Sequence, residues 1–305
     1  MLNEIVFSGD FMGSAKPRLN LISSMVIFGT IGAFVRLIPL SSGGIAFCRA
    51  CLAVMLIGAF LLIKREKIPV KSIKKELPLL LLSGAAMGVN WILLFEAYKY
   101  TTVSLATLSY YFAPVIVTVA CPILFREKLT AKQIICFIMS TLGIVMITGT
   151  GSKGGTDLIG IFFGIGAAVL YATVVLINKF IKNVDGIHRT FLQFVSAAAV
   201  LLPYALITRS LDFSKFDLKS TVMLLIVGFV HTGIAYCLYF PSLRGVSGQE
   251  AALLSYVDPL VAVLVSVTFL REGMTLLQVI GGALILGFAF INEIKFKKKQ
   301  GDNSK

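Results

Sequence analysis

Long apolar runs alternate with short polar segments along the whole chain. Ten runs are too long for buried strands, and the polar gaps between them are short. A helix of about 20 apolar residues crosses a bilayer core about 30 Å thick. The pattern therefore predicts an all-α integral membrane protein with ten transmembrane helices. The runs cover residues 20–38, 44–63, 77–97, 102–124, 131–149, 158–178, 188–208, 219–240, 249–269 and 275–292.

The composition agrees with a membrane protein. Of the 305 residues, 57% are hydrophobic and 14% are charged, whereas soluble domains carry about 25% charged residues. The mean hydropathy is +0.90. No gap between apolar runs can hold a soluble domain of about 50 residues. A disordered chain, a fibrous protein and an extramembrane enzyme domain are therefore excluded.

The net charge of +13 is explained by topology. With the N-terminus in the cytoplasm, twenty Lys and Arg residues fall on the cytoplasmic side and seven on the other side. The positive-inside rule then predicts that both tails, residues 1–19 and 293–305, are cytoplasmic. No nucleic-acid partner is expected. The first twenty residues lack the features of a signal peptide. Together with the basic cytoplasmic side, this predicts a multi-pass protein of the cell membrane, in a bacterium the inner membrane.

The chain contains an internal repeat. Residues 95–133 match residues 240–278 at nine identical positions, and Arg-Glu-x-x-Thr-x-x-Gln recurs at 126–133 and 271–278. A weaker match with an offset of 143 to 144 aligns Arg36 with Lys179 and Phe47 with Phe191. The duplicated unit has five helices, at 20–149 and 158–292. Because five is odd, the second unit must cross the membrane upside down, as in many transporters.

Each unit has an apolar helix with a proline, then a short turn, then a polar start to the next helix. The motifs are Pro114 with Phe125-Arg126-Glu127 and Pro259 with Leu270-Arg271-Glu272. This pattern resembles the EamA-type members of the drug/metabolite transporter superfamily, which have ten helices and two EamA repeats. The similarity covers about residues 20–292. The resemblance implies a carrier of small metabolites, often an exporter of amino acids or related compounds, and leaves the substrate open.

One position departs from that family. Asp258 precedes Pro259, where the first repeat has Ala113 and the family usually has an uncharged residue. A carboxylate at bilayer depth is by default a functional-site hypothesis. Asp258 is predicted to bind a proton or the amino group of a substrate. The alternative is a structural pair with a basic side chain or a tyrosine hydroxyl.

Two further side chains have both a functional and a structural interpretation. Arg49, six residues into the second apolar run, either attracts an anionic group such as a carboxylate or snorkels to the surface. His231 either handles protons or is a hydrogen-bonded structural residue.

The regions around the two prolines are predicted to form the central site. Mid-helix prolines free backbone carbonyls that can line a cavity, so helix kinks are expected at Pro114 and Pro259. For Asn90 and the other polar groups the alternative is a hydrogen bond between helices. The candidate substrate-binding residues are Asp258, Arg49, Asn90, Trp91, Tyr110, Tyr111, Tyr171, Tyr236 and Tyr256.

The sequence also predicts one ion pair near a helix end and close packing at two glycine spacings. Glu96 is expected to pair with Lys99. The spacings Gly84-x-x-x-Gly88 and Gly160-x-x-x-Gly164 indicate close packing within the bundle, or else a dimer face.

No catalytic or metal-binding pattern stands out. Two separated histidines make no zinc site, and neither nucleophile motifs nor a phosphate-binding loop occur. We therefore expect no enzyme activity, no metal and no cofactor. The predicted function is secondary transport, as an exporter of small metabolites such as amino acids, by alternating access between two inverted repeats. The alternative is a channel or a non-transporting membrane sensor. The expected partners are a small-molecule substrate and the lipid bilayer, and the expected state is a monomer or a weak homodimer.

Overall fold

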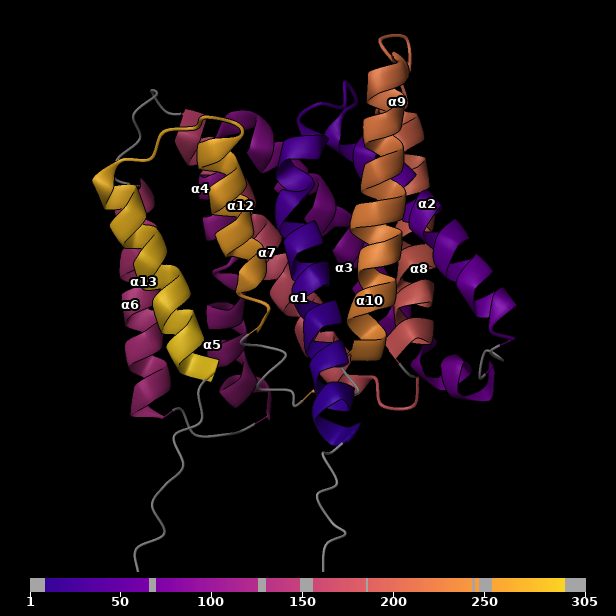
Figure 1. Cartoon of the computed structure of the whole chain (residues 1–305), viewed down its shortest axis with the longest axis horizontal. Helices are drawn as coiled ribbons and strands as arrows, with labels where there is room; N and C mark the ends of the chain where they lie inside the picture. The colour runs from indigo at the N-terminus through magenta and orange to yellow at the C-terminus, as the bar shows by residue number, and fades with distance from the viewer. Residues whose placement is uncertain are drawn as a thin grey trace, which may run out of the picture.

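The computed structural model describes residues 9–65, 70–125, 130–148, 156–184, 186–242, 245–246 and 254–293, and these residues form helices and connecting loops (Figure 1). The helices of the first half are α1 (Gly9–Val35), α2 (Ser42–Ile63), α3 (Val70–Tyr100), α4 (Val103–Tyr110), α5 (Ala113–Phe125) and α6 (Ala131–Thr148). Those of the second half are α7 (Thr156–Phe180), α8 (Gly186–Ile207), α9 (Leu218–Leu225), the π-helix η1 (Ile226–Ile234), α10 (Ala235–Ser242), α12 (Val257–Thr268) and α13 (Leu276–Glu293).

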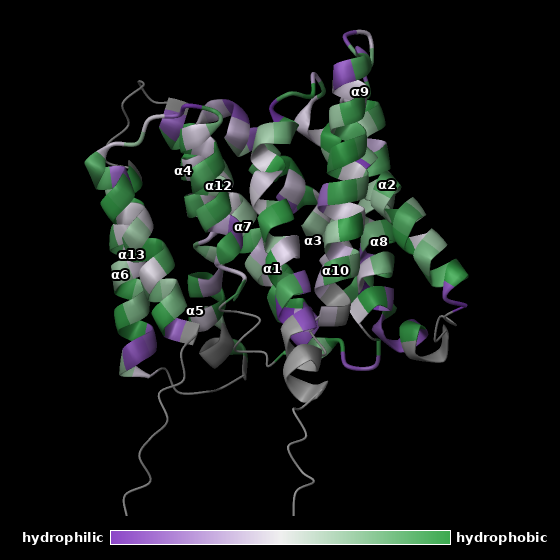
Figure 2. Cartoon of the chain, in the orientation of Figure 1, coloured by the Kyte–Doolittle hydropathy of each residue, from purple (hydrophilic) through white to green (hydrophobic). Residues whose placement is uncertain are grey.

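The prediction of an all-helical membrane protein is confirmed for the described residues. Seven helical stretches are long and apolar enough to cross a bilayer, and three shorter apolar helices cover 131–147, 257–268 and 276–292. The count of ten spans stays a prediction, because length alone does not assign the three shorter helices. Apolar residues dominate the middle of the bundle and polar ones its two ends (Figure 2). Large apolar side chains face outward, as a lipid environment allows, among them Met55, Leu62, Phe162, Leu206 and Leu264.

The expected helix at 102–124 is not continuous. It breaks at Tyr111–Phe112 into α4 and α5. Proline has no N–H group, and its ring clashes with the carbonyl four residues earlier. Pro114 therefore sits in the first turn of a new helix rather than in the middle of an old one. The second repeat behaves alike, since a turn at Ser255–Tyr256 precedes α12 and Pro259 lies in its first turn.

Helix contacts follow the predicted repeat. In the repeat, α1 corresponds to α7, and α3 corresponds to α9, η1 and α10. The contact between α3 and α7 therefore has its counterpart in the contact between α1 and α10. The contact between α1 and α12 likewise corresponds to the contacts of α7 with α4 and α5. The contact of α3 with α8 likewise corresponds to that of α2 with η1. Three further contacts, α2–α8, α4–α12 and α6–α13, each join a helix to its own counterpart in the other repeat. In Figure 1, α1 begins and α13 ends at the lower end of the bundle, and the loop of residues 36–41 lies at the upper end.

Small residues let the backbones approach closely at these crossings. A Cβ on Gly84 would lie 2.4 Å from the Gln193 carbonyl oxygen of α8, and one on Gly160 would lie 2.6 Å from the Thr101 side chain. Gly88 faces Leu201, and Gly164 faces Ser109. All four glycines thus face helices or loops of their own chain, which confirms the prediction of packing within the bundle.

The α3–α8 crossing generates a stability prediction. Gly84→Val should lower the free energy of unfolding by about 1–3 kcal/mol, because the added side chain overlaps the α8 backbone. The matched control is Gly287→Val on α13, where a Cβ meets nothing within 4 Å. Thermal unfolding of the purified variants in one detergent measures both. Equal stability of the two variants would contradict the close approach of α3 and α8.

Candidate functional site

The two helix breaks meet at the middle of the bundle. Tyr111 and Tyr256 are equivalent positions of the two repeats, 145 residues apart, and their ring centroids lie 6.3 Å from each other. Contact between equivalent residues places the pseudo-two-fold axis between them. Discontinuous helices at a repeat interface are a recurring frame for substrate sites in transporters.

Asp258 lies beside this axis, in the first turn of α12. The Tyr111 hydroxyl donates a hydrogen bond of 2.7 Å to Asp258 Oδ2, so the bond joins the broken helix of one repeat to that of the other. The positive end of the α12 dipole also favours a carboxylate here. Among the described residues, no cation lies within ion-pair distance of Asp258. Of the two structural partners weighed for Asp258, the tyrosine is present.

Tyrosine rings extend from the axis toward α7. Tyr110 packs against Tyr111 and Tyr171, with ring centroids 5.9 Å and 5.3 Å away. Four of the predicted site tyrosines therefore gather around Asp258: Tyr110, Tyr111, Tyr171 and Tyr256.

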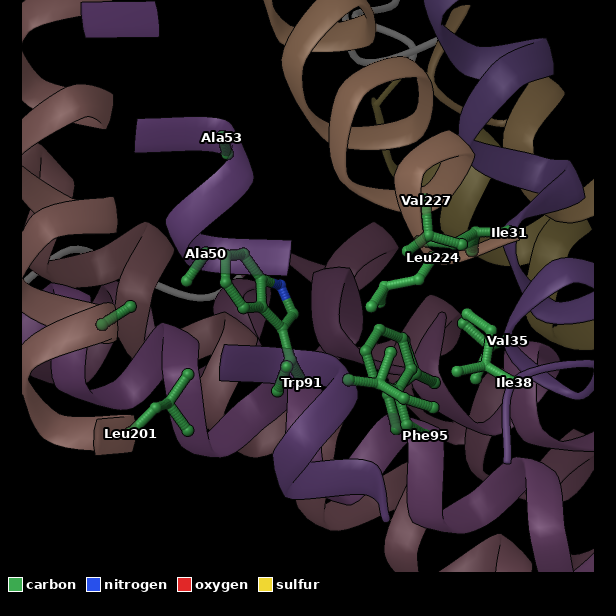
Figure 3. Packing of buried hydrophobic residues seen from close by; sticks show 14 of the residues in the cluster. Ile31, Val35, Ile38, Ala50, Ala53, Trp91, Phe95, Leu201, Leu224 and Val227 are labelled. Atoms are coloured by element: carbon green, nitrogen blue, oxygen red, sulfur yellow. The ribbon is translucent and has the colours of Figure 1, made fainter. Parts of the chain in front are cut away.

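A second group of side chains surrounds Arg49 on α2. Arg49 is only 5% exposed, so it does not snorkel to the surface. Its Nε donates to Thr232 Oγ1 at 2.7 Å. Its guanidinium carbon lies 4.4 Å from the centroid of the Trp91 ring and 5.6 Å from that of Phe95. Figure 3 shows the Trp91 indole beside Ala50, the chain neighbour of Arg49.

The π-helix η1 positions the partners of this group. Thr232 Oγ1 donates to the Val227 carbonyl at 2.9 Å, and His231 Nδ1 lies 3.3 Å from the Ile226 carbonyl, both five residues back. A π-turn is wider than an α-turn and is frequent at functional sites. The wide turn presents Thr232 to Arg49 and His231 Nε2 to Thr30 Oγ1 on α1, 2.8 Å away.

The two groups form one continuous region. Tyr98, Tyr110 and Tyr236 belong to the same hydrophobic cluster as Trp91 and Phe95, which lie against Arg49. Phe194 links Tyr236 to Trp91 through ring contacts of 5.1 Å and 5.3 Å. A cation from the first repeat and a carboxylate from the second thus flank a set of tyrosines.

Other predicted residues lie outside this region or have structural partners. Asn90 donates to the Ala167 carbonyl of α7 at 2.5 Å and ties α3 to α7. Lys99 Nζ lies 2.9 Å from Glu96, which confirms that predicted pair. Sequence reasoning did not single out Thr232, Thr30 and Phe95 as site residues. The repeat offers no sign of Thr232, because its match 145 residues earlier is Met87.

A cavity opens between α1, α2 and α3 at the upper end. Its volume of about 420 Å³ lies within the range of small-molecule sites. Phe95 lines it and also contacts the Arg49 guanidinium, and Ile45, one turn before Arg49, lines it as well. The lining residues are Val35, Arg36, Ile38, Leu40, Ile45, Phe95, Tyr98 and Lys99.

An ion pair holds several helix ends together beside this cavity. Arg36, which follows α1, pairs with Glu272, which follows α12. Arg36 also donates to the carbonyls of Tyr98 and Thr101. Glu272 in turn accepts from the Val103 N–H at 2.9 Å and from the Ser266 hydroxyl. We call this network the Arg36–Glu272 clasp. It joins the upper ends of α1, α3, α4 and α12.

The chain is similar to known transporters over most of its length. The sequence profile of the EamA-like transporter family matches residues 17–149 and again 158–293. "Uncharacterized transporter YxxF" of Bacillus subtilis (strain 168) is 32% identical over 270 residues, which cover 88% of this chain and 86% of the relative. An "Uncharacterized transporter" of Archaeoglobus fulgidus is 28% identical over 273 residues, which cover 89% of this chain and 94% of the relative.

Solved structures share the fold, among them a crystal structure. It matches with a TM-score of 0.64 at 17% identity, over 90% of this chain and 96% of the other. The expected resemblance to EamA-type transporters with two repeats is confirmed by these matches.

The clasp generates a prediction about access from the upper end. Glu272→Gln should speed maleimide labelling of a cysteine placed at Ile38 by about tenfold, because charge-assisted hydrogen bonds contribute about 1.5–3 kcal/mol. The background is the chain with its five native cysteines replaced by alanine. Asp212→Asn, which changes an exposed carboxylate that bonds Ser214 in the loop after α8, is the control and should leave the rate unchanged. Equal labelling rates in both variants would mean that the clasp does not limit access.

Proposed function

The chain belongs to the EamA-like transporter family, and on that premise we propose that it is a secondary active exporter of small metabolites such as amino acids. The observation that carries the proposal is the hydrogen bond between Tyr111 and Asp258, which joins the broken helices of the two halves at their shared axis. A substrate bound there contacts both halves at once. Movement of one half against the other then exposes the same site to each side in turn.

The proposed topology has two inverted units, 20–149 and 158–292, in the inner membrane of a bacterium. The tails, 1–19 and 293–305, lie in the cytoplasm, so the lower end of Figure 1 is cytoplasmic and the clasp closes the outer end. The main contacts between helices recur when the two units are exchanged, and this symmetry supports the plan of two inverted units. The carrier acts as a monomer or a weak homodimer.

The site chemistry supports an amphipathic substrate. Trp91 and the tyrosines offer aromatic faces to its apolar part, while Arg49 or Asp258 holds its charged part. Asp258 is also the first candidate for a coupled proton, because a carboxylate without a cationic partner at this depth is most stable when protonated or bound to a cation. His231, bonded to Thr30, is the second candidate.

Proton coupling through Asp258 is testable in proteoliposomes. Asp258→Asn should abolish the dependence of transport on a pH gradient, because an amide keeps the shape of the side chain and loses the titrating proton. Asp157→Asn is the matched control, since Asp157 is also buried but bonds Thr101 at the upper end, away from the site. Unchanged pH dependence in Asp258→Asn would remove Asp258 from the coupling mechanism.

Transport itself is tested by counterflow. Proteoliposomes loaded with a pooled metabolite mixture should exchange one chemical class saturably, as read by mass spectrometry, because a carrier binds its substrate in each cycle. Heat-unfolded protein in the same liposomes is the control. Silence across amino acids, sugars, nucleosides and organic acids from folded protein would overturn the carrier and favour a sensor. Ion currents without saturation would favour a channel.

A further inference from the structure

Arg49 keeps most of its hydrogen-bonding capacity unused inside the bundle. A guanidinium has five N–H donors, and among the described residues only the Nε–H of Arg49 has a partner, Thr232 Oγ1. Among the described residues, no carboxylate lies within 4 Å of it. Both terminal nitrogens still reach accessible space, since neither is among the enclosed side-chain atoms that lack a partner. A cation that is only 5% exposed thus keeps four of its N–H donors without a partner in the described helices and loops.

The other repeat shows that the fold does not require a cation at this position. The offset of 144 residues that aligns Phe47 with Phe191 also aligns Arg49 with Gln193. The Gln193 amide is satisfied, because it donates to Ser83 Oγ at 2.6 Å and to Asn178 Oδ1 at 2.7 Å. A neutral amide with internal partners therefore fulfils the packing role. The part of the chain that the structure describes supplies no acceptor for the remaining donors of Arg49, which leaves them available to a ligand.

We propose that Arg49 binds the carboxylate group of the transported substrate, so that the substrates are small carboxylic acids with an apolar body. This inference rests on the proposed transport function and narrows its substrate class. The two terminal nitrogens of a guanidinium match the two oxygens of a carboxylate in a bidentate pair. Trp91 and Phe95, which cover the guanidinium, supply apolar surface for the rest of the molecule.

The charge balance favours a carboxylate over a phosphate. Arg49 is one cation, and the nearby cations at the upper end, Arg36 and Lys99, are already paired with Glu272 and Glu96. A phosphomonoester dianion would leave negative charge uncompensated at bilayer depth. A carboxylate neutralises Arg49 and leaves Asp258 available for a proton or for an amino group on the same substrate.

The cavity lies near Arg49. Its wall contains Ile45, one helical turn before Arg49, and Phe95, which contacts the guanidinium. Its volume of about 420 Å³ suits a metabolite of amino-acid size.

The single tryptophan of the chain reports on this site without a label. Trp91 is the only tryptophan, and it lies against Arg49. We would titrate the full-length protein in lipid nanodiscs and follow Trp91 fluorescence. The probes are 4-methylpentanoate, L-leucine, their neutral or cationic amides (4-methylpentanamide and L-leucinamide), and glycerol 3-phosphate.

The expected result is a saturable change with the two carboxylates and little or none with the amides and the phosphate. Arg49→Gln should raise the dissociation constant about tenfold or more, because a charge-assisted pair is lost. Arg49→Lys should lie between the two, since it keeps the charge but not the fork. Arg209→Gln, which removes an exposed cation from the upper-end loop, is the matched control and should bind like the wild type.

Gln stands at the equivalent position of the other repeat, so Arg49→Gln is expected to fold, and its melting temperature checks this. If it unfolds, Arg49→Lys against Arg209→Gln carries the test. Amides that bind as well as carboxylates, or no response to either carboxylate at millimolar concentration, would overturn the inference. So would wild-type affinity in both Arg49 variants. A stronger response to glycerol 3-phosphate would replace the carboxylate with a phosphate.

Counterflow separates this inference from the transport proposal. Saturable exchange of uncharged or cationic metabolites, with no carboxylate exchanged, would keep the carrier and overturn the role of Arg49. Carboxylate binding at Trp91 without any exchange would keep the Arg49 site and overturn the carrier.

Discussion

The constraint on which the structure depends is that backbone polar groups in a hydrocarbon layer must find partners within the protein. Each repeat breaks its helix in the bundle interior, at Tyr111–Phe112 and at Ser255–Tyr256, and Pro114 and Pro259 lie in the first turn of the helix that follows each break. Such breaks are tolerated only where neighbouring groups satisfy them. At this point the Tyr111 hydroxyl lies 3.4 Å from the Ser255 carbonyl and 2.7 Å from the Asp258 carboxylate, and the two equivalent tyrosines pack against each other. The proline pair thus sets the place where the halves meet.

A nearly symmetric frame holds an asymmetric set of charges. Asp258 has Ala113 as its counterpart, and Arg49 has Gln193. The π-helix η1 likewise belongs to the second half, while its counterpart α3 is an α-helix throughout. Symmetric packing allows two similar conformations of opposite orientation. The asymmetric residues place a carboxylate from the second half and a guanidinium from the first half within the same bundle.

The upper end combines access with closure. The cavity lies between α1, α2 and α3 and is lined by Phe95, which also contacts the Arg49 guanidinium. The Arg36–Glu272 clasp ties helix ends from both halves beside it. Arg36 is partly exposed, whereas the Glu272 side chain is nearly buried. Because Glu272 accepts from three groups, its release would free the upper ends of α1, α4 and α12 together. The same residues thus limit the cavity and couple the two repeats.

Local sequence was sufficient for the helical class, the repeat and the family. Hydropathy over twenty-residue runs reflects the cost of polar groups in lipid, which acts on each segment alone. The matching Pro and Arg-Glu positions of the two halves reveal the duplication, and they too can be read from the sequence alone. Sequence also singled out Asp258 and Arg49, because ionisable residues in apolar runs are rare.

Only the tertiary structure decided what these residues contact. It showed that Tyr111 bonds Asp258, that Arg49 is covered by Trp91 instead of reaching the surface, and that Asn90 serves the α3–α7 contact. The π-turn that brings Thr232 to Arg49 was not predicted from the sequence, and η1 packs on α1 and α2. The clasp likewise joins residues more than 200 positions apart. Apolar periodicity determines that a segment forms a helix and that this helix lies in the membrane. The direction in which its few polar side chains point depends on the rotation and crossing angle of the helix, and these are set by packing among all the helices at once.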